Sequence, residues 1–202
     1  MNVATQELGT RELYQLLVNG VTPRPIAWIS TVSDDGIDNL APYSFFNVVS
    51  VNPPVLSYTQ VNPQSGVDKD TLQNLEANGE CVVHIVSEHT LEKMNQSCAS
   101  LPLDQSEFEF ADIASEPSLS VAPRSVSDAW VRYECTLRDV VRISAEPGGG
   151  TMVLLDVKQV VINDELLNDG KIDQHKLNAV GKMGGDFYSF THELTALSRP
   201  TI

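Results

Sequence analysis

The hydrophobic and polar positions of the chain follow two periods, and each period predicts a different kind of element. Residues 10–20, TRELYQLLVNG, place leucines at helical spacing, so we predict a helix that Thr10 caps. Residues 69–79, KDTLQNLEANG, predict a second helix with Asp70 as its N-cap and a glycine at its end. A third helix is predicted over 87–96. These three helices separate segments of a different pattern.

The remaining segments have the composition and period of β-strands. The segment PIAWISTVS is β-branched and aromatic, and the SDDG after it predicts a hairpin turn in which Gly36 has a positive φ. Prolines at 53 and 54 interrupt the strand ladder that follows. Further strands are predicted over 37–50, 53–61 and 80–87.

The strongest strand signal lies in the last third of the chain. Residues 129–145 and 151–163 form two arms of about fifteen residues around the turn EPGGG. Strands of this length exceed the usual five or six residues and are typical of a closed barrel. Predicted strands outnumber helices about two to one, so we expect a mainly β protein, an antiparallel barrel with peripheral helices.

Composition narrows the class of protein. With 202 residues the chain is long enough for one domain with a substantial core, and no repeat or linker divides it. Its formal net charge of −14 comes from 27 acidic and 13 scattered basic residues, which argues against binding to nucleic acid. A single phosphate on a small ligand remains compatible, because a few amides and one cation can hold it.

Cysteine usage and hydropathy indicate the compartment. Cys81, Cys98 and Cys135 are odd in number and unevenly spaced, which favours free thiols in a reducing environment. The N-terminus has no basic start followed by an apolar block, and no run of about 18 apolar residues exists. We therefore expect a cytoplasmic protein that does not contact a membrane.

Familiar catalytic motifs are missing from the sequence. The four histidines form no HExxH or Cys/His cluster, so we expect no metal site, and no serine lies in GxSxG. PGGGT stands between two strands and is better explained as a hairpin turn than as a phosphate loop. No GxGxxG follows a strand, which removes the usual dinucleotide-binding fold. We expect no catalytic side chain.

Three short segments combine apolar and hydrogen-bonding groups. YSFFN at 43–47 and SYTQ at 57–60 offer aromatic faces and polar edges in neighbouring strands. KDT at 69–71 places a cation and a hydroxyl at a helix N-terminus, which favours an anion. Together they suit a planar, phosphorylated ligand. Composition alone leaves that ligand unidentified, and core packing of the phenylalanines or simple helix capping would also explain these residues.

The chain resembles a known family in three stretches. They occur in the order seen in the flavin reductase-like family of FMN-binding split barrels, in the branch that includes flavoredoxins. The three stretches are TPRPIAWISTVSDDGIDNLAPYSFFNVVSVNPPVLSYT, KDTLQNLEANGECVVHIVSEHTLEKMN and VGKMGGDFYS. The resemblance runs from about 21 to 189. It implies that residues 1–202 form a single Greek-key split-barrel domain with short terminal extensions. It also implies a homodimer that holds FMN near the subunit interface.

The resemblance also implies roles for individual residues. Residues 44–47 would line the isoalloxazine ring, and residues 57–60 would approach its polar edge or the ribityl chain. Lys69 and Thr71 would hold the phosphate, and Tyr188 would close over the flavin. The implied cofactor-binding residues are Arg24, Thr31, Ser44, Phe45, Phe46, Asn47, Ser57, Tyr58, Thr59, Gln60, Lys69, Thr71 and Tyr188.

At three places the chain departs from the family pattern. Relatives often carry an arginine before the glycine pair, where this chain offers Lys182. His84 stands where relatives commonly have asparagine, and we interpret it as a buried histidine with hydrogen-bond partners, the alternative being a proton donor. The segment LLDVKQVV lacks the Gly-Asp-His signature of the reductases of two-component monooxygenases.

The resemblance predicts an FMN-dependent oxidoreductase of the NAD(P)H:flavin reductase type. NADH or NADPH would supply electrons to FMN, and free flavin or a redox partner would accept them. The alternative is an electron-transfer module that holds FMN without turning over a nicotinamide. A third interpretation is a split barrel that binds no flavin.

Overall fold

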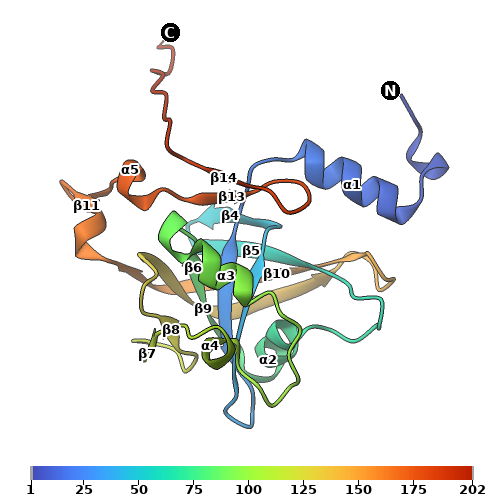
Figure 1. Cartoon of the computed structure of the whole chain (residues 1–202), viewed down its shortest axis with the longest axis horizontal. Helices are drawn as coiled ribbons and strands as arrows, with labels where there is room; N and C mark the ends of the chain where they lie inside the picture. Colours follow the sequence, from blue (N-terminus) through green and yellow to red (C-terminus); the bar gives the residue numbers. More distant parts are fainter. Residues whose placement is uncertain (1, 202) are drawn as a thin grey trace.

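The computed structural model describes residues 2–201, and its centre is a seven-stranded antiparallel sheet that curls into a split barrel (Figure 1). The edge strands β3 and β4 are consecutive in the chain, joined by Ser44 and Phe45. The backbone N–H of Thr59 donates to the carbonyl of Phe45 at 2.8 Å, which draws this link onto β5. The fold prediction is confirmed. In spatial order the strands are β3 (Asp38–Tyr43), β2 (Ala27–Val32), β6 (Glu80–Ile85), β9 (Val131–Arg142), β10 (Gly150–Ile162), β5 (Pro54–Val61) and β4 (Phe46–Val51).

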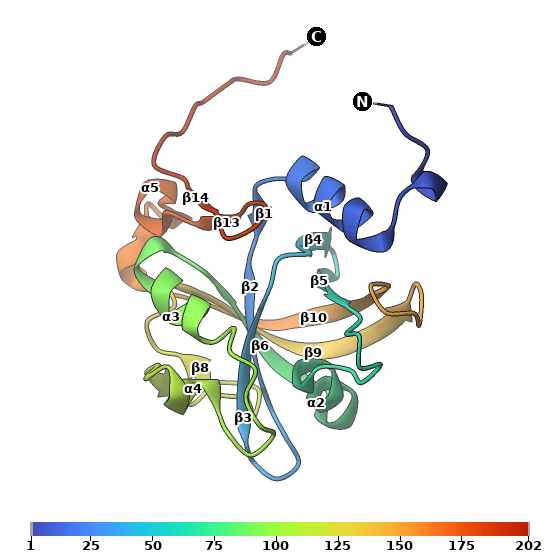
Figure 2. The ribbon, with the colours of Figure 1, turned by 45° about the vertical axis from the view of Figure 1, so that its right-hand side comes forward.

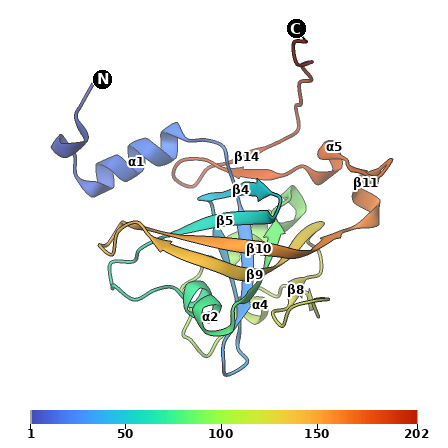
Figure 3. The ribbon, with the colours of Figure 1, turned by 180° about the vertical axis from the view of Figure 1, so that it is seen from behind.

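The long hairpin predicted from the sequence is formed by β9 and β10, which have 12 and 13 residues. Their register shifts twice, between Leu154 and Leu155 and between Val157 and Gln159. Such irregularities bend and twist a strand, so the two long arms can follow the curvature of the barrel. Figure 3 shows the hairpin crossing the barrel as its longest element.

Helix α2 (Asp70–Asn78) packs against β2, β3 and β6. Leu72 and Leu75 are fully buried in the barrel core, as the helical spacing predicted. Gly79 ends the helix with φ 74°. Lys69, and not Asp70, is the N-cap residue, and no side chain caps this end of the helix.

A second apolar cluster lies outside the barrel, where Trp28 and Leu40 on the outer face of β2 and β3 pack against Met94 and Phe108. The covering segments are the 3₁₀ turn η2 (Glu88–Thr90), α3 (Leu91–Gln96), α4 (Glu107–Phe110), β7 (Ser115–Glu116) and β8 (Ser125–Val126). Residues 100–127 contain only the short elements α4, β7 and β8. The buried carboxylate of Glu134 fixes part of this segment by accepting the backbone N–H groups of Leu119 and Ser120.

His84 is fully buried on this outer face and has partners for both ring nitrogens. Its Nε2 accepts the N–H of Val126 at 2.9 Å, so its Nδ1 carries the hydrogen and donates to the carbonyl of Trp28 at 2.8 Å. Burial lowers the pKa of His84 to about 3. The interpretation of His84 as a neutral, hydrogen-bonded residue agrees with this geometry.

Helix α1 (Thr10–Gly20) stands apart from the barrel (Figures 1 and 2). Gly9 precedes it as N-cap and donates its N–H to Glu12 at 3.0 Å, so the prediction that Thr10 caps the helix is wrong. Val18 is its one buried residue, whereas Leu16 and Leu17 are exposed. The leucine spacing therefore marks a face that this chain leaves uncovered.

The C-terminal third adds small elements beside the barrel. A three-stranded sheet joins β1 (Arg24–Pro25), β13 (Val180–Lys182) and β14 (Tyr188–Phe190). Residues 191–201 extend without regular structure on the side where α1 lies (Figure 1). Within residues 2–201, every helix is too short or too polar to cross a bilayer. The remaining elements are η1 (Thr5–Glu7), η3 (Asp164–Leu166), β11 (Leu167–Asn168), β12 (Lys171–Ile172) and α5 (Gln174–Leu177).

Candidate functional site

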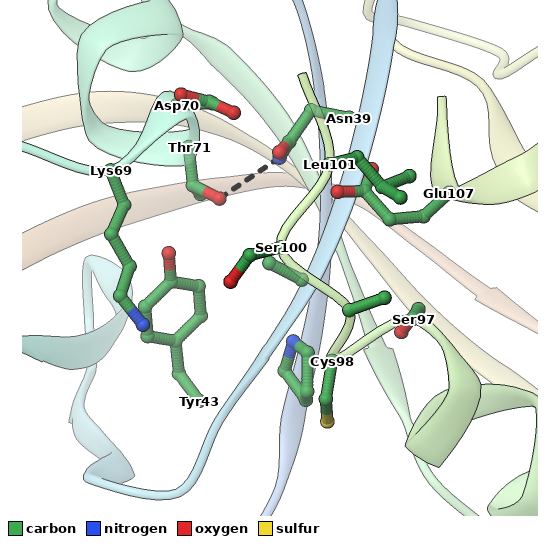
Figure 4. A pocket seen from close by; sticks show the side chains of 13 residues that line it. Asn39, Tyr43, Lys69, Asp70, Thr71, Ser97, Cys98, Ser100, Leu101 and Glu107 are labelled. Atoms are coloured by element: carbon green, nitrogen blue, oxygen red, sulfur yellow. Dashed lines mark hydrogen bonds between the residues drawn. The ribbon is translucent and has the colours of Figure 1, made fainter. Parts of the chain in front are cut away.

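A cavity of about 300 Å³ lies between β3, the start of α2 and the segment after α3 (Figure 4). Several hydroxyl groups border it, so we call it the hydroxyl cavity. Lys69 and Thr71, both predicted from the sequence, are part of its wall. Its full lining is Asn39, Ala41, Pro42, Tyr43, Lys69, Asp70, Thr71, Ser97, Cys98, Ala99, Ser100, Leu101 and Glu107.

The start of α2 is held in place by Gln60 of β5. The Gln60 side chain accepts the N–H of Lys69 at 3.0 Å and donates to Asp68 at 2.7 Å. This leaves the Lys69 ammonium on the cavity side, 5.6 Å from the centroid of the Tyr43 ring. Within residues 2–201, the ammonium has no hydrogen bond or ion pair. The N-terminus of α2 and Lys69 thus face the cavity with donor capacity to spare.

The Thr71 hydroxyl is held by Asn39, which belongs to a small network with Thr31 and Asn74. Asn39 donates from Nδ2 to Thr71 Oγ1 at 2.9 Å and to Thr31 Oγ1 at 3.2 Å. Asn74 donates to the same Thr31 oxygen at 3.0 Å. Because the Thr71 oxygen already accepts a hydrogen bond, its own hydrogen is free to point at a ligand. Thr71 is thus a donor at the cavity wall.

Tyr43 contributes a further hydroxyl to the cavity. Its side chain is almost fully buried, and its Oη has no hydrogen-bond partner among the residues that the structure describes. Burial raises the pKa of Tyr43, and the neighbouring Thr71 hydroxyl opposes that effect. Figure 4 shows the hydroxyls of Tyr43, Thr71 and Ser100 directed toward the same region.

Two carboxylates border the hydroxyl cavity. Glu107 accepts the backbone N–H of Leu40 at 2.8 Å, and burial raises the pKa of this glutamate. In Figure 4 it lies beside Leu101, across the cavity from Lys69. Asp70 is the second carboxylate, and it lies next to Thr71 at the start of α2. The cavity therefore holds carboxylates as well as donors.

A second depression of about 510 Å³, which we call the aromatic groove, lies between α1, β1, the link from β3 to β4, and the strands β4 and β5. Seven of the predicted residues border it: Arg24, Ser44, Phe45, Phe46, Asn47, Ser57 and Thr59. Leu17, Val21, Pro23 and Pro25 complete its lining. The groove offers aromatic faces next to small polar side chains, as expected for the edge of a planar ligand.

The Arg24 side chain makes most of its hydrogen bonds within the chain. Its guanidinium donates to the carbonyls of Val18, Val21 and Met183 and to the hydroxyl of Ser44. The first two carbonyls lie at the end of α1, where a cation is favourable. Arg24 therefore ties α1 to the barrel and has little donor capacity left for a phosphate, which the sequence alone did not reveal.

A small cavity of about 140 Å³ connects the two larger ones. Ser44 borders both this cavity and the aromatic groove, while Pro42 and Cys98 border both it and the hydroxyl cavity. Tyr188 closes its outer side, with the Lys182 ammonium 4.3 Å from the ring centroid and its hydroxyl donating to Asn95 at 3.0 Å. These shared wall residues place the three depressions next to one another, in a row.

Three predicted residues do not reach any of these depressions. Tyr58 is fully buried in the barrel core, with its ring centroid 4.6 Å from that of Tyr43. Thr31 is buried behind Asn39, and Gln60 is buried behind the start of α2. Strand alternation explains this placement, because Ser57 and Thr59 face the groove while Tyr58 and Gln60 face the interior. In the structure these three residues support the site and do not line it.

The sequence analysis assigned no individual ligand role to several polar residues of the hydroxyl cavity, among them Asn39, Tyr43, Ser100 and Glu107. Asn39 and Tyr43 are on β3 at positions that alternation places on the same face as each other, a signal present in NLAPYSFFN. Ser100 follows α3 in an irregular stretch, and Glu107 is the first residue of the short helix α4. No periodicity marks the stretch between α3 and α4, so its return to β3 was not predictable.

Comparison with known families gives a match over most of the chain. The family model described as "Flavin reductase like domain" matches residues 19–176. An uncharacterized protein of Halalkalibacterium halodurans is 35% identical over 204 residues, covering 100% of this chain and 98% of that protein.

Solved structures give a consistent picture. Nitrilotriacetate monooxygenase component B from Bacillus cereus is 30% identical with a TM-score of 0.92, covering 98% of both chains. The 2-nitrobenzoate 2-nitroreductase of Pseudomonas fluorescens is 27% identical with a TM-score of 0.88, covering 100% of this chain and 97% of that one. Flavoredoxin of Desulfovibrio vulgaris shares the fold, at 16% identity, a TM-score of 0.74, and coverage of 88% and 92%.

Proposed function

Because the chain belongs to the family of flavin reductase like domains, as its sequence motifs predicted, we propose that it is an FMN-dependent oxidoreductase. In this proposal NADH or NADPH donates electrons to bound FMN, and free flavin or another acceptor takes them. FMN, when bound, supplies a ring that accepts a hydride and releases electrons one or two at a time.

The single observation that carries the proposal is the row of adjoining depressions with different chemistry at its two ends. Lys69, Thr71 and the uncapped start of α2 offer a cation and donors for the phosphate at one end. Residues 44–47 offer aromatic faces and small polar groups for the ring at the other. The orphaned hydroxyl of Tyr43 agrees with a ligand that completes the hydrogen bonding of the cavity.

In this proposal the protein orients its ligands, and no side chain has to transfer a proton. Tyr188 and Lys182 cover the connecting cavity and exclude water from the ring. Ser44 and Asn47 fix the position of the ring along the groove. The nicotinamide then reaches the ring from the open side of the groove.

We further propose that the chain acts as a homodimer of single-domain subunits. Leu17 of α1 and Val48, Val49 and Val51 of β4 are exposed large apolar residues on neighbouring elements beside the aromatic groove. Clustered exposed apolar residues favour a protein contact. Sedimentation equilibrium should give twice the chain mass of 22.1 kDa, and a monomer at micromolar concentration contradicts this part of the proposal.

Anaerobic mixing of the FMN-loaded protein with NADH or NADPH tests the catalytic proposal. Rapid bleaching of the oxidised flavin band supports the oxidoreductase. Reduction only by dithionite or by a reduced protein partner supports the electron-transfer module instead. A protein that takes up no added FMN contradicts both and favours a split barrel without flavin.

A further inference from the structure

Tyr43 carries a buried hydroxyl that the fold itself does not use. The residue is 6% exposed, and its Oη lacks a hydrogen-bond partner among residues 2–201. An unpaired hydroxyl in a protein interior lowers stability, and phenylalanine would fill the same space without that cost. The Tyr43 hydroxyl is therefore available for a hydrogen bond to a molecule from outside the chain.

An unpaired hydroxyl alone is no sign of a ligand, because Tyr58 has one as well. The two tyrosines differ in what surrounds them. Tyr58 is fully buried in the barrel core, whereas Tyr43 borders the hydroxyl cavity. Only Tyr43 is thus in a position to meet a bound molecule.

The surroundings of Tyr43 define the chemistry of that molecule. The hydroxyls of Tyr43, Thr71 and Ser100 point toward one region in Figure 4, and Asn39 leaves the Thr71 hydrogen free to donate. The Lys69 ammonium, which makes no contact with a carboxylate in the described chain, lies over the Tyr43 ring. A group that accepts several hydrogen bonds and carries negative charge fits this set of donors.

We propose that Tyr43 donates its hydroxyl hydrogen to the terminal phosphate of the bound flavin, and that this donor makes the cavity select FMN over riboflavin. The inference rests on the proposed function, which supplies the phosphorylated ligand. Asp70 and Glu107 border the same cavity, so selection comes from the donors and not from net charge. The Tyr43 hydroxyl is buried in the ligand-free chain, and Tyr43 borders the cavity that the phosphate would enter.

The test compares Tyr43→Phe with Tyr58→Phe, a matched control that removes the unpaired hydroxyl of the other tyrosine. Isothermal titration gives the affinity of each protein for FMN and for riboflavin. We expect Tyr43→Phe to weaken FMN binding roughly tenfold or more, because a hydrogen bond to a charged group is lost. Its riboflavin affinity, and both affinities of Tyr58→Phe, should stay within about threefold of the wild type.

Thermal unfolding supplies a second readout that does not depend on activity. Without ligand, both variants should unfold at or above the wild-type temperature, because each loses an unpaired buried hydroxyl. At a fixed FMN concentration only Tyr43→Phe should fall below the wild type. A variant that unfolds above the wild-type temperature without FMN and below it with FMN has lost a ligand contact, whereas a packing defect lowers the unfolding temperature in both conditions.

The outcomes separate the inference from the proposed function. Equal FMN affinity of the wild type and Tyr43→Phe overturns the inference and leaves FMN binding intact. If the wild type takes up no FMN, the proposed function fails, and inorganic phosphate becomes the probe. The selection of FMN then falls with the proposed function. The phosphate contact of Tyr43 stands if phosphate raises the unfolding temperature of the wild type more than that of Tyr43→Phe, and falls if it does not.

Discussion

Thr71→Val and Thr31→Val are a matched pair that separates binding from support. Both threonines accept a hydrogen bond from Asn39 Nδ2, at 2.9 Å for Thr71 and 3.2 Å for Thr31. Only Thr71 borders the hydroxyl cavity, while Thr31 is fully buried behind it. Valine keeps the shape of threonine and removes the hydroxyl.

The structure predicts that Thr31→Val is the less stable variant and that Thr71→Val has the weaker affinity for FMN. Thr71→Val leaves Asn39 with its second acceptor, so the free energy of unfolding should fall by about 0.5–1.5 kcal/mol. Thr31→Val deprives both Asn39 and Asn74 of an acceptor and should cost about 1–3 kcal/mol. FMN affinity should fall roughly 10- to 150-fold in Thr71→Val, because a charge-assisted hydrogen bond of about 1.5–3 kcal/mol is lost.

Urea unfolding measures the stability of the two variants, and fluorescence titration measures their affinity for FMN. Thr31→Val should be the less stable variant and yet keep FMN affinity within about threefold of the wild type. If Thr31→Val loses as much affinity as Thr71→Val, the effect is structural and the assignment of Thr71 as a phosphate ligand is refuted.

Three other predictions follow from buried polar groups. The pKa of His84 is lowered from 6.5 to about 3, so the folded state binds fewer protons than the unfolded state and stability falls as pH drops below 6.5. The free energy of unfolding should fall by about 2 kcal/mol between pH 6.5 and pH 5 from this group. Urea unfolding of His84→Asn at the two pH values should lack this part of the decrease. Arg24→Met should release α1 from the barrel, seen as faster proteolysis and hydrogen exchange within 10–20, and unchanged rates there would contradict the anchoring role. Glu134→Ala should lower the free energy of unfolding by about 2–3 kcal/mol, because the backbone N–H groups of Leu119 and Ser120 lose a charged acceptor, and Glu134→Gln should lower it less. Equal stability of the wild type and both variants refutes this.

The elements predicted from the sequence are those whose pattern is local. The hairpin over 129–163 has strict strand composition on both sides of a glycine turn, and it occurs as β9 and β10. The helix over 69–79 combines inward leucines with a glycine stop, and it occurs as α2. Each of these signals depends on neighbours in the chain, so tertiary contacts did not override it.

The predictions that differ from the structure depend on contacts between distant segments. The leucines of 10–20 have helical spacing, yet Leu16 and Leu17 are largely exposed, because periodicity defines an apolar face without saying what covers it. The family resemblance implied a cofactor contact for Arg24, and the sequence did not show that its guanidinium also bonds to carbonyls of residues 18, 21 and 183. Pattern analysis has no access to such pairings.

The candidate site shows the same division. Lys69 and Thr71 were identified because a cation and a hydroxyl at the start of a helix form a local motif. Tyr43 was not, because its importance lies in an unpaired hydroxyl, which appears only once its neighbours are placed. Ser100 lies in an irregular stretch and Glu107 in the four-residue helix α4, and neither carries a periodic signal, so their role required the structure.

The central claim is that one end of the run of depressions binds a phosphate and the other end binds the flavin ring. A crystal structure of the protein with FMN tests this most directly. We predict phosphate oxygens within hydrogen-bonding distance of Thr71 and the Lys69 ammonium, and the ring against residues 44–47. Flavin density at another surface, or none at saturating FMN, would contradict the account.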